Sequence, residues 1–484
     1  MTQEIRWLAV LPELILALGA AAVLLIEVQW KPRRAVLGAA AAVSLALAAA
    51  CALAQWVAAQ EAPAAARVGE LTEFSGMVLM DGFAVFARLT LLAVTGLGLA
   101  AGWRLMEDLG RRGAEAIALV LLAATGFSIM VAANNLVMMF LGLEVGSIAL
   151  YVLAGAARER AEPDEAAMKY FLLGAFASAI FAYGAALLYA GTGRLEVLAI
   201  RGFFEAFVVT SPAVIYAGLA LVIVGLAFKV SAAPFHSWAP DVYQGAPAGV
   251  VGYMAATAKI AGFAALARIL LTGLPRLDDR WLPVVAGVSA LSMVLGSTLA
   301  LVQRDVRRML AYSGVASAGF IMTGVVGGGT APLLFYVAVY TVQLVGAFAV
   351  VAAVGGSTAS GAPLEEYGGL ASKSPGLAAS FVVLLLGMAG LPLTSGFAAK
   401  FAVFARAWAA GYEWLVVVAL LTSVVVFAAY LRVVVAMYME EAAGGDIDAA
   451  PSAKAALAVA VTATVAWGVA PGSLLDIAAD AFPL

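Results

Sequence analysis

The stretch AVIYAGLALVIVGLAFKVSAAPFHSWAPDVYQGAP, residues 213–247, decides how this chain folds. The run before Lys229 carries no charged side chain, as expected of a helix inside a lipid bilayer. Lys229, the only histidine of the chain (His236), Asp241 and three prolines then follow closely. Irregular backbone at membrane depth is tolerated only where it is buried in protein or lines a watered cavity. The stretch therefore predicts a membrane helix that is broken beside a polar site.

The composition places the whole chain in a membrane. Of its 484 residues, 64% are hydrophobic and only 12% are charged, whereas a soluble domain carries about 25% charged residues. Apolar runs repeatedly reach the ~20 residues that a membrane-spanning helix needs. We therefore predict an all-α polytopic membrane protein. The single cysteine, Cys51, excludes a disulfide, an iron–sulfur cluster or a cysteine-based zinc site within this chain.

Apolar runs and their charged or Pro/Gly breaks predict about fourteen transmembrane helices. The seventh runs into the Pro234–Pro247 region, and the twelfth is interrupted at GLPLTSG, residues 390–396, so both are predicted to be broken. The predicted spans are 7–27, 35–57, 82–102, 115–133, 135–155, 166–190, 212–232, 248–272, 281–302, 309–326, 332–354, 375–410, 413–438 and 455–472.

The distribution of basic residues predicts the orientation, because cytoplasmic loops carry an excess of Lys and Arg. With the N-terminus outside, the inner segments hold Lys31, Arg33, Arg34, Arg104, Arg111, Arg112, Arg158, Arg160, Arg304, Arg307, Arg308, Lys373 and Lys454. The outer segments hold Arg6, Arg67, Arg194, Arg201, Arg276 and Arg280. Both termini are therefore predicted on the periplasmic side, and Pro234–Pro247 at the cytoplasmic end of its helix.

Several function classes are excluded by what lies between the spans. The longest hydrophilic interruptions, 58–81 and 439–454, are too short for a soluble domain with its own core. The glycines at 327–329 lack the lysine and the strand-to-helix context of a phosphate-binding loop. Basic residues are scattered among short loops, so no nucleic-acid partner is predicted.

Ionisable residues inside the predicted spans point to the chemistry, since each costs roughly 2.5–3.5 kcal/mol to insert. Of the seven lysines, four fall inside spans, whereas most arginines lie outside or at span ends; the four are Lys169, Lys229, Lys259 and Lys400. Lysine changes its protonation state on burial far more readily than arginine does. This bias favours sites that gain and lose protons.

Depth within the spans separates these candidates. Lys259, Glu144 and Lys400 lie deep, where a side chain cannot easily reach the interface. Lys169 is the fourth residue of its span, so snorkelling to the cytoplasmic interface explains it as well as function does. Lys229 lies near a span end, but the break that follows argues against snorkelling. The structural alternative for all of them is that buried charges only set the register of the helices.

Three further residues carry weaker signals. Glu13 lies near the outer end of the first span, where an anchoring role explains it as well as a catalytic one. Asp81 directly precedes the third span and is predicted to cap its N-terminus. His236 alone would be an ordinary interfacial histidine, but beside Lys229 and a broken helix it is a candidate proton relay.

The energies of these groups suit proton movement. At an effective dielectric constant near 20, opposite charges ~4 Å apart attract by about 4 kcal/mol, equivalent to roughly three pKa units. Making and breaking one Glu–Lys pair could therefore switch a lysine between holding and releasing a proton. Moving one charge across 100 mV takes only ~2.3 kcal/mol.

Five segments resemble a known family. They are FKVSAAPFHSWAPDVYQGAP (228–247), LEVGSIALYVLAG (143–155), AAMKYFLLGAFASAIFAYGAALLY (166–189), LVQRDVRRMLAYSGVASAGF (301–320) and LLGMAGLPLTSGFAAKF (385–401). Together they are similar to subunit N of bacterial NADH-quinone oxidoreductase, respiratory complex I. This family of antiporter-like membrane subunits is related to subunits of Mrp-type cation/proton antiporters. The similarity covers nearly the whole chain after about residue 70.

The resemblance implies a fourteen-helix fold with two inverted five-helix repeats and with broken helices 7 and 12. It divides the chain into an N-terminal three-helix segment, a first repeat of helices 4–8, a second repeat of helices 9–13 and a C-terminal helix 14. The corresponding residues are 1–110, 111–275, 276–440 and 441–484.

Motif matches assign family roles to individual residues. Glu144 matches the family's key glutamate and Lys229 its broken-helix lysine. Lys259 matches the central connecting lysine, Lys400 the lysine of the second broken helix, and Lys169 a further lysine beside the glutamate.

Two positions depart from the family pattern. Ser317 stands where AYSSIxHxGY has a histidine, and Leu344 stands where an asparagine is common. A proton path from Lys259 to Lys400 must then use water, Ser317 or another group.

The function that the resemblance implies is proton translocation coupled to quinone reduction elsewhere in complex I. It implies an enzyme subunit, a translocase without a redox centre, with FMN, iron–sulfur clusters and quinone in other subunits. Expected partners are the antiporter-like subunit M, small K- and J-type subunits and the lipid of a bacterial inner membrane. Two alternatives stay open, an Mrp-type cation/proton antiporter subunit and a structural assembly subunit.

Overall fold

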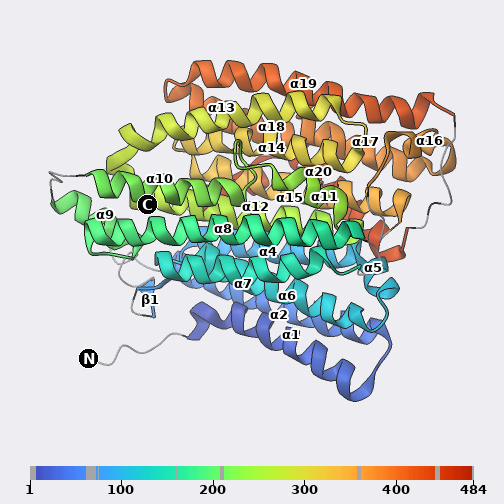
Figure 1. Ribbon diagram of the computed structural model, residues 1–484, viewed down its shortest axis with the longest axis horizontal. Coiled ribbons are helices and arrows are strands. Elements are labelled where there is room, and N and C mark those ends of the chain that lie inside the picture. The colour runs from blue at the N-terminus through green and yellow to red at the C-terminus, as the bar shows by residue number, and fades with distance from the viewer. Residues whose placement is uncertain are drawn as a thin grey trace.

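The computed structural model describes residues 7–61, 72–74, 76–157, 161–207, 212–356, 361–441, 447 and 449–481. The two chain ends, and four arginines used in the orientation argument (Arg6, Arg67, Arg158 and Arg160), lie outside these residues. Long helices run side by side across the molecule, with α1 and α2 along one edge and α19 along the opposite edge (Figure 1).

Within the described residues, fourteen α-helices of 15 or more residues make up the bundle. They are α1 (Leu11–Trp30), α2 (Arg34–Glu61), α4 (Gly82–Ala101), α6 (Arg112–Ala132), α7 (Leu136–Ala154), α8 (Ala161–Thr192), α10 (Ala213–Lys229), α12 (Ala248–Ala267), α13 (Asp278–Val302), α14 (Val306–Val326), α15 (Thr330–Gly355), α17 (Pro375–Ala389) with its continuation α18 (Ser395–Ala409), α19 (Glu413–Met439) and α20 (Pro451–Val469), where α17 and α18 are counted as one broken helix.

Short elements connect them at the two ends of the bundle. They are η1 (Trp7–Val10), β1 (Thr72–Glu73), β2 (Val78–Leu79), α5 (Trp103–Asp108), α9 (Val197–Ala206), α11 (Trp238–Gly245), the π-helical η2 (Arg268–Gly273), η3 (Pro275–Leu277), η4 (Leu364–Tyr367), α16 (Leu370–Lys373) and α21 (Gly472–Asp480). The strands pair antiparallel, Thr72 with Leu79 and Glu73 with Val78. Helices α9 and α16 mark opposite ends of the bundle (Figure 1).

Twelve helical segments within the described residues are long and apolar enough to cross a membrane. Two shorter apolar helices, α10 and α17, each end at a break and continue beyond it as α11 and α18. The prediction of an all-α polytopic membrane protein is confirmed, and each predicted span coincides with a helix or with one of these broken pairs. The count of fourteen crossings, the inverted repeats and the four-part division stay predictions.

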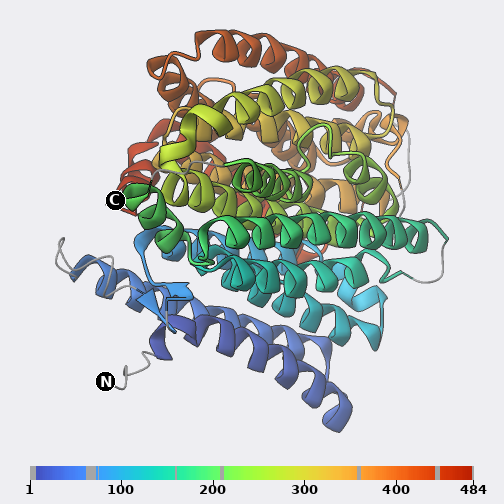
Figure 2. The same ribbon diagram turned by 60° about the vertical axis from the view of Figure 1, so that its left-hand side comes forward.

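The core of the bundle is formed by α12, α14 and α15, which are buried along nearly their whole length. These helices are apolar on all sides, as expected of helices surrounded by other helices. The edge helices α1, α2 and α19 expose one face, which carries large apolar side chains such as Leu25 and Val424. In the view of Figure 2 the blue α1 and α2 lie at the edge of the bundle.

The predicted cap of the third span is confirmed. Asp81 accepts a hydrogen bond from the backbone N–H of Ala84, 2.9 Å away, at the start of α4. The same carboxylate pairs with Arg268 at the end of α12, so one residue both begins α4 and ties it to the core.

Candidate functional site

Three lysine amines lie deep in the bundle, each on a different helix. Lys229 ends α10, Lys259 lies within α12 and Lys400 within α18. They are only 3%, 1% and 5% exposed, respectively. The prediction that these three side chains are buried is confirmed, and their amines must be satisfied by protein groups or water.

Lys229 is held by a hydroxyl group rather than by a carboxylate. Its Nζ donates to Ser147 Oγ on α7 at 2.7 Å and lies 4.8 Å from the centre of the Phe127 ring. Glu144 precedes Ser147 by three residues on α7, yet it forms no ion pair with Lys229 in this structure. Its Oε1 is buried without a hydrogen-bond partner among the described residues. The Glu144–Lys229 pair is therefore separated here.

Lys259 joins the first helix break to α14. Its Nζ donates to the carbonyl oxygen of Val230 at 2.8 Å and to Ser231 Oγ at 3.1 Å, both just after α10. It also donates to the carbonyl oxygen of Gly314 on α14 at 2.9 Å. Three acceptors match the three N–H groups of an ammonium ion. This site is built to hold a charged amine.

Lys400 occupies an equivalent place at the second break. Its Nζ donates to the carbonyl oxygen of Ala389, the last residue of α17, at 2.7 Å and to Ser423 Oγ on α19 at 3.1 Å. The amine also lies 4.3 Å from the centre of the Phe320 ring. In both breaks the first half-helix thus presents a carbonyl from its C-terminal end to a lysine. That end carries partial negative charge, which favours a cation.

One face of α14 connects the last two lysines. Gly314 accepts from Lys259, Phe320 packs against Lys400, and Ser317 lies midway between them on the same helix face. At 1.5 Å per residue the six residues from Gly314 to Phe320 span about 9 Å. Ser317, which stands where the family motif has its histidine, is buried on α14 between these two contact residues.

A buried amide stands beside the second departure from the family pattern. Leu344 is fully buried, and the preceding residue, Gln343, donates from Nε2 to Ser395 Oγ at 3.0 Å. Ser395 is the first residue of α18. The second break therefore has an amide contact although the family's asparagine position holds leucine.

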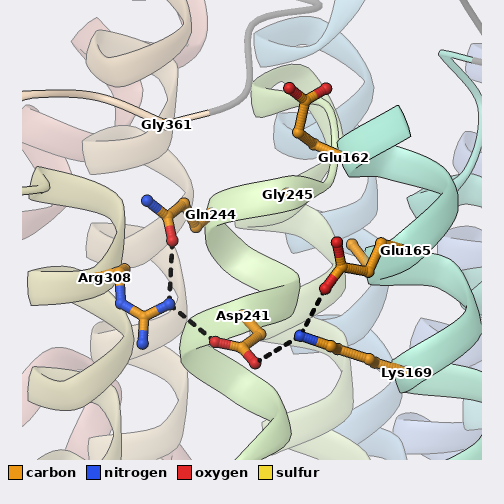
Figure 3. Close-up of a pocket in the computed structure, with 9 residues that line it drawn as sticks. Glu162, Glu165, Lys169, Asp241, Gln244, Gly245, Arg308 and Gly361 are labelled. Atoms are coloured by element: carbon orange, nitrogen blue, oxygen red, sulfur yellow. Dashed lines mark hydrogen bonds and ion pairs between the residues drawn. The ribbon is translucent and has the colours of Figure 1, made fainter. Parts of the chain in front are cut away.

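Lys169 lies apart from the other lysines, in the polar cavity drawn in Figure 3. Its Nζ is 2.8 Å from Glu165 and 3.1 Å from Asp241, and its side chain is 44% exposed. Lys169 lies near the start of α8 and its side chain reaches the surface, as the snorkelling alternative requires. The position beside Glu144 that the motif match implies stays a prediction.

Asp241 links α11 to two neighbouring helices in this cavity of about 400 Å³. It accepts from Lys169 of α8 and, at 2.8 Å, from Arg308 of α14, which also donates to Gln244 at 2.9 Å. Burial raises the pKa of Asp241, but the hydrogen bonds from Arg308 and Lys169 outweigh it and leave that pKa below its ordinary value. Figure 3 shows Asp241 between the two cations.

His236 lies in the break between α10 and α11, half-buried, with its ring 6.2 Å from that of Tyr312 and edge-on to it. Nearby, Trp238 Nε1 donates to the carbonyl oxygen of Phe228 at 3.0 Å and so satisfies part of the C-terminal end of α10. The N–H groups of Val230, Ser231 and Ala232 also donate to carbonyl oxygens of α10. A relay role for His236 stays a prediction.

Glu13 has the contacts of an anchor. It pairs with Arg88 of α4 at 2.6 Å and accepts from Ser128 of α6 at 2.6 Å, and Arg88 also donates to Gln55 of α2 at 2.8 Å. This buried network ties α1 and α2 to the rest of the bundle. Arg88 is an exception to the tendency of arginines to lie outside the spans, and the sequence did not single it out.

The serine partners of the lysines were also missed. Ser147 follows Glu144 by three residues, which places it on the same side of α7 as that candidate, whereas Ser231 and its partner Lys259 are 28 residues apart. Ser423 is on a different helix from Lys400, and nothing in the sequence connects the two.

Comparisons with known proteins show the family in which this arrangement of helices and lysines occurs. Residues 133–426 match the family described as NADH:quinone oxidoreductase/Mrp antiporter, TM. NADH-quinone oxidoreductase subunit N from Mycobacterium bovis is 46% identical over 392 residues, which cover 79% of this chain and 73% of that protein. The chain belongs to the subunit N family of NADH-quinone oxidoreductase. It is thus an antiporter-like membrane subunit of complex I by family.

Solved structures of the family have the same fold. A chain of respiratory complex I from Thermus thermophilus with bound aureothin is 35% identical, with a TM-score of 0.81 over 96% of this chain and 98% of that chain. A chain of the Mrp complex from Dietzia is 20% identical with a TM-score of 0.84, over 99% of this chain and 97% of that one, and shows the shared fold alone. Among the described residues no cluster of His, Cys, Asp and Glu could hold a metal ion.

Proposed function

We propose that this subunit N chain translocates protons across the membrane in response to quinone reduction elsewhere in NADH-quinone oxidoreductase. The single observation that carries the proposal is the site of Lys259. Its amine is fully buried and shared between the first break and α14, with three acceptors placed for its three N–H groups. A buried amine between two halves of a bundle can pass a proton from one half to the other.

The proposed sequence begins at Glu144 and Lys229. When the carboxylate approaches Lys229, attraction of about 4 kcal/mol at ~4 Å favours the protonated amine. When the pair separates, as it is separated here, the amine can release its proton towards Lys259. Transfer from Lys259 to Lys400 then follows the α14 face that carries Ser317.

Lys169 and His236 belong to the cytoplasmic side of this scheme. Lys169 lies in the cavity of Figure 3 between the carboxylates of Glu165 and Asp241, and Glu162 lines the same cavity. His236 lies in the break that follows Lys229. Proton uptake from this end is consistent with the excess of basic residues in the loops predicted to be cytoplasmic.

The same proposal includes the partner subunits of the chain, its membrane and its orientation. Its partners are the other membrane subunits of complex I, the antiporter-like subunit M and small K- and J-type subunits, in a bacterial inner membrane. Both termini are on the periplasmic side. The chain itself carries no redox centre, and FMN, iron–sulfur clusters and quinone belong to other subunits.

The test is a complex that carries Lys259→Ala, reconstituted into liposomes. Quinone reductase activity and proton pumping are measured together, with Lys454→Ala, at an exposed lysine, as the matched control. We expect pumping to fall strongly in Lys259→Ala and to stay at the wild-type level in Lys454→Ala. Wild-type values of both activities in Lys259→Ala would overturn the proposed function, because the site of this residue carries it.

Two alternatives make different predictions. A cation/proton antiporter subunit would transport in a sodium-dependent way without any redox partner. A structural assembly subunit would lose assembly when its buried charges are neutralised, yet every assembled variant would pump normally. The curated relatives carry the name of the oxidoreductase subunit, which favours the first proposal.

A further inference from the structure

Each of the three buried lysines donates a hydrogen bond to a serine hydroxyl. The distances are 2.7 Å from Lys229 to Ser147, 3.1 Å from Lys259 to Ser231 and 3.1 Å from Lys400 to Ser423. The serines come from unrelated places, namely α7, the first break and α19. The recurrence of one partner type at three separate sites indicates a shared requirement.

Two of these hydroxyls are oriented by the backbone. Ser147 donates its own proton to the carbonyl oxygen of Leu143, one turn earlier on α7. Ser231 donates to the carbonyl oxygen of Val230 at 2.6 Å. A hydroxyl has one donor and two acceptor lone pairs. With the proton committed to a carbonyl, the oxygen is left to accept from the lysine.

The three lysines differ in what else holds them. Among the described residues, Lys259 has two carbonyl acceptors besides Ser231, and Lys400 has one besides Ser423. Lys229 donates to Ser147 alone. Loss of the serine would therefore leave Lys229 with none of its protein acceptors, Lys400 with one and Lys259 with two.

Ser147 also offers the amine of Lys229 a hydrogen-bond acceptor in place of Glu144. The two residues are three apart on α7, so both lie on the same side of that helix. The carboxylate oxygen Oε1 of Glu144 is buried and has no hydrogen-bond partner among the described residues, while the amine rests on the hydroxyl. A short movement of the Lys229 side chain would exchange one partner for the other.

We propose that Ser147, Ser231 and Ser423 are positioning residues that hold the amines of Lys229, Lys259 and Lys400 where each exchanges its proton, with Ser147 as the partner of Lys229 whenever the Glu144 pair is separated. This inference rests on the proposed proton translocation and deepens it. The serines accept hydrogen bonds and give up no proton of their own.

The test uses the whole complex in liposomes, with Ser147→Ala, Ser423→Ala and Ser231→Ala made one at a time. Since a hydrogen bond to a charged group is worth more than one between neutral groups, we expect the rate of NADH-driven pumping to fall about tenfold, fivefold and twofold, respectively. The pH profile of pumping should shift most in Ser147→Ala. Ser147→Thr keeps the hydroxyl and should restore both pumping and the profile.

The matched control is Ser297→Ala. Ser297 is buried and donates to a carbonyl oxygen of its own helix α13, that of Val294 at 3.2 Å, and it receives no lysine hydrogen bond. Its removal should leave the pumping rate and pH profile unchanged. If Ser147→Ala fails to assemble, Ser147→Cys replaces it, because sulfur keeps the volume but accepts hydrogen bonds weakly. Ser147→Cys should lose about as much of the pumping rate as Ser147→Ala.

The outcomes separate this inference from the proposed function. Wild-type pumping and pH profile in Ser147→Ala, with pumping lost in Lys259→Ala, would overturn the serine roles alone. Wild-type pumping in Lys259→Ala would overturn the proposed function. Equal losses in all three serine variants and in Ser297→Ala would show a general packing effect, and would also overturn the serine roles.

Discussion

The two helix breaks use the same device in different surroundings. After α10 and after α17 a backbone carbonyl at the end of a half-helix accepts a lysine hydrogen bond, from Lys259 and Lys400 respectively. The part of the first break that contacts Lys259, from Val230 to Ala233, is buried, with the N–H of Ala233 donating to Ser292 of α13 at 2.9 Å. The second opens onto an apolar crevice of about 360 Å³ that Lys400 lines.

The side chains around the crevice explain the difference. Phe401 is 66% exposed and Trp408 53% exposed, whereas nearly every residue of α12 around Lys259 is buried. Two lysines with equivalent backbone partners therefore have different access to the exterior of the bundle. The comparison teaches that the repeated break sets where the amine is held, while the neighbouring helices set what can reach it.

The largest effect is expected in how readily a reagent reaches the positions of the two lysines. With Cys51 changed to serine, Lys400→Cys should react with a small apolar maleimide faster than Lys259→Cys by about tenfold or more, since the enclosed site is reached only through local opening of the fold. The measurement is the labelling rate of the purified subunit in lipid nanodiscs. Equal rates at both positions would contradict the comparison.

The backbone of the second break offers a stability test. Gly390 has φ +87°, a left-handed conformation, and a Cβ there would lie 2.8 Å from Cδ of Lys400. Gly390→Ala should therefore lower the free energy of unfolding by about 2–3 kcal/mol. Gly376→Ala, in the same half of this helix and with open space around it, is the control and should be near neutral. Thermal unfolding of both variants would decide this.

A smaller loss of stability is expected from a substitution at the first break. Ser292→Ala removes the acceptor of the buried N–H of Ala233, which should cost about 1–2 kcal/mol. On the same helix, Thr298→Val removes an exposed hydroxyl that donates to Val294 and should change stability little. If the two variants unfold at the same temperature, the hydrogen bond from Ala233 to Ser292 does not stabilise the first break.

The smallest effect on stability is expected from a substitution in the cavity of Figure 3. Asp241→Asn should destabilise the fold by less than about 1 kcal/mol at pH 7, because both ion pairs are partly exposed. The pKa of Asp241 is below its ordinary value in the folded chain, so its contribution is present above the ordinary pKa and is lost as pH falls through the folded one.

The difference in unfolding temperature between wild type and Asp241→Asn should therefore shrink on acidification from pH 7 towards pH 3. Glu162 lines the same cavity and forms no ion pair with another described residue, so Glu162→Gln serves as the control. A difference that stays constant with pH would show that the charge of Asp241 is not what stabilises the fold.

The sequence was sufficient for the helices and for the depth of the lysines. A bilayer demands long apolar runs, so each span can be read from composition, and both breaks follow from Pro and Gly inside such runs. Asp81 was correctly predicted as a cap from its place before α4. The surface position of Lys169 was one of two alternatives that the sequence left open, because a place near a helix end does not say which way the side chain turns.

What the sequence by itself determined is an all-α membrane bundle with two broken helices and three deep lysines, since these depend on local hydrophobicity and backbone chemistry. Only the tertiary structure decided the partners of those lysines. Ser423 reaches Lys400 from another helix, Gly314 reaches Lys259 across the two halves, and Ser147 replaces Glu144 at Lys229. Such contacts depend on how separate helices pack, and helix packing is set by the shapes of many side chains at once.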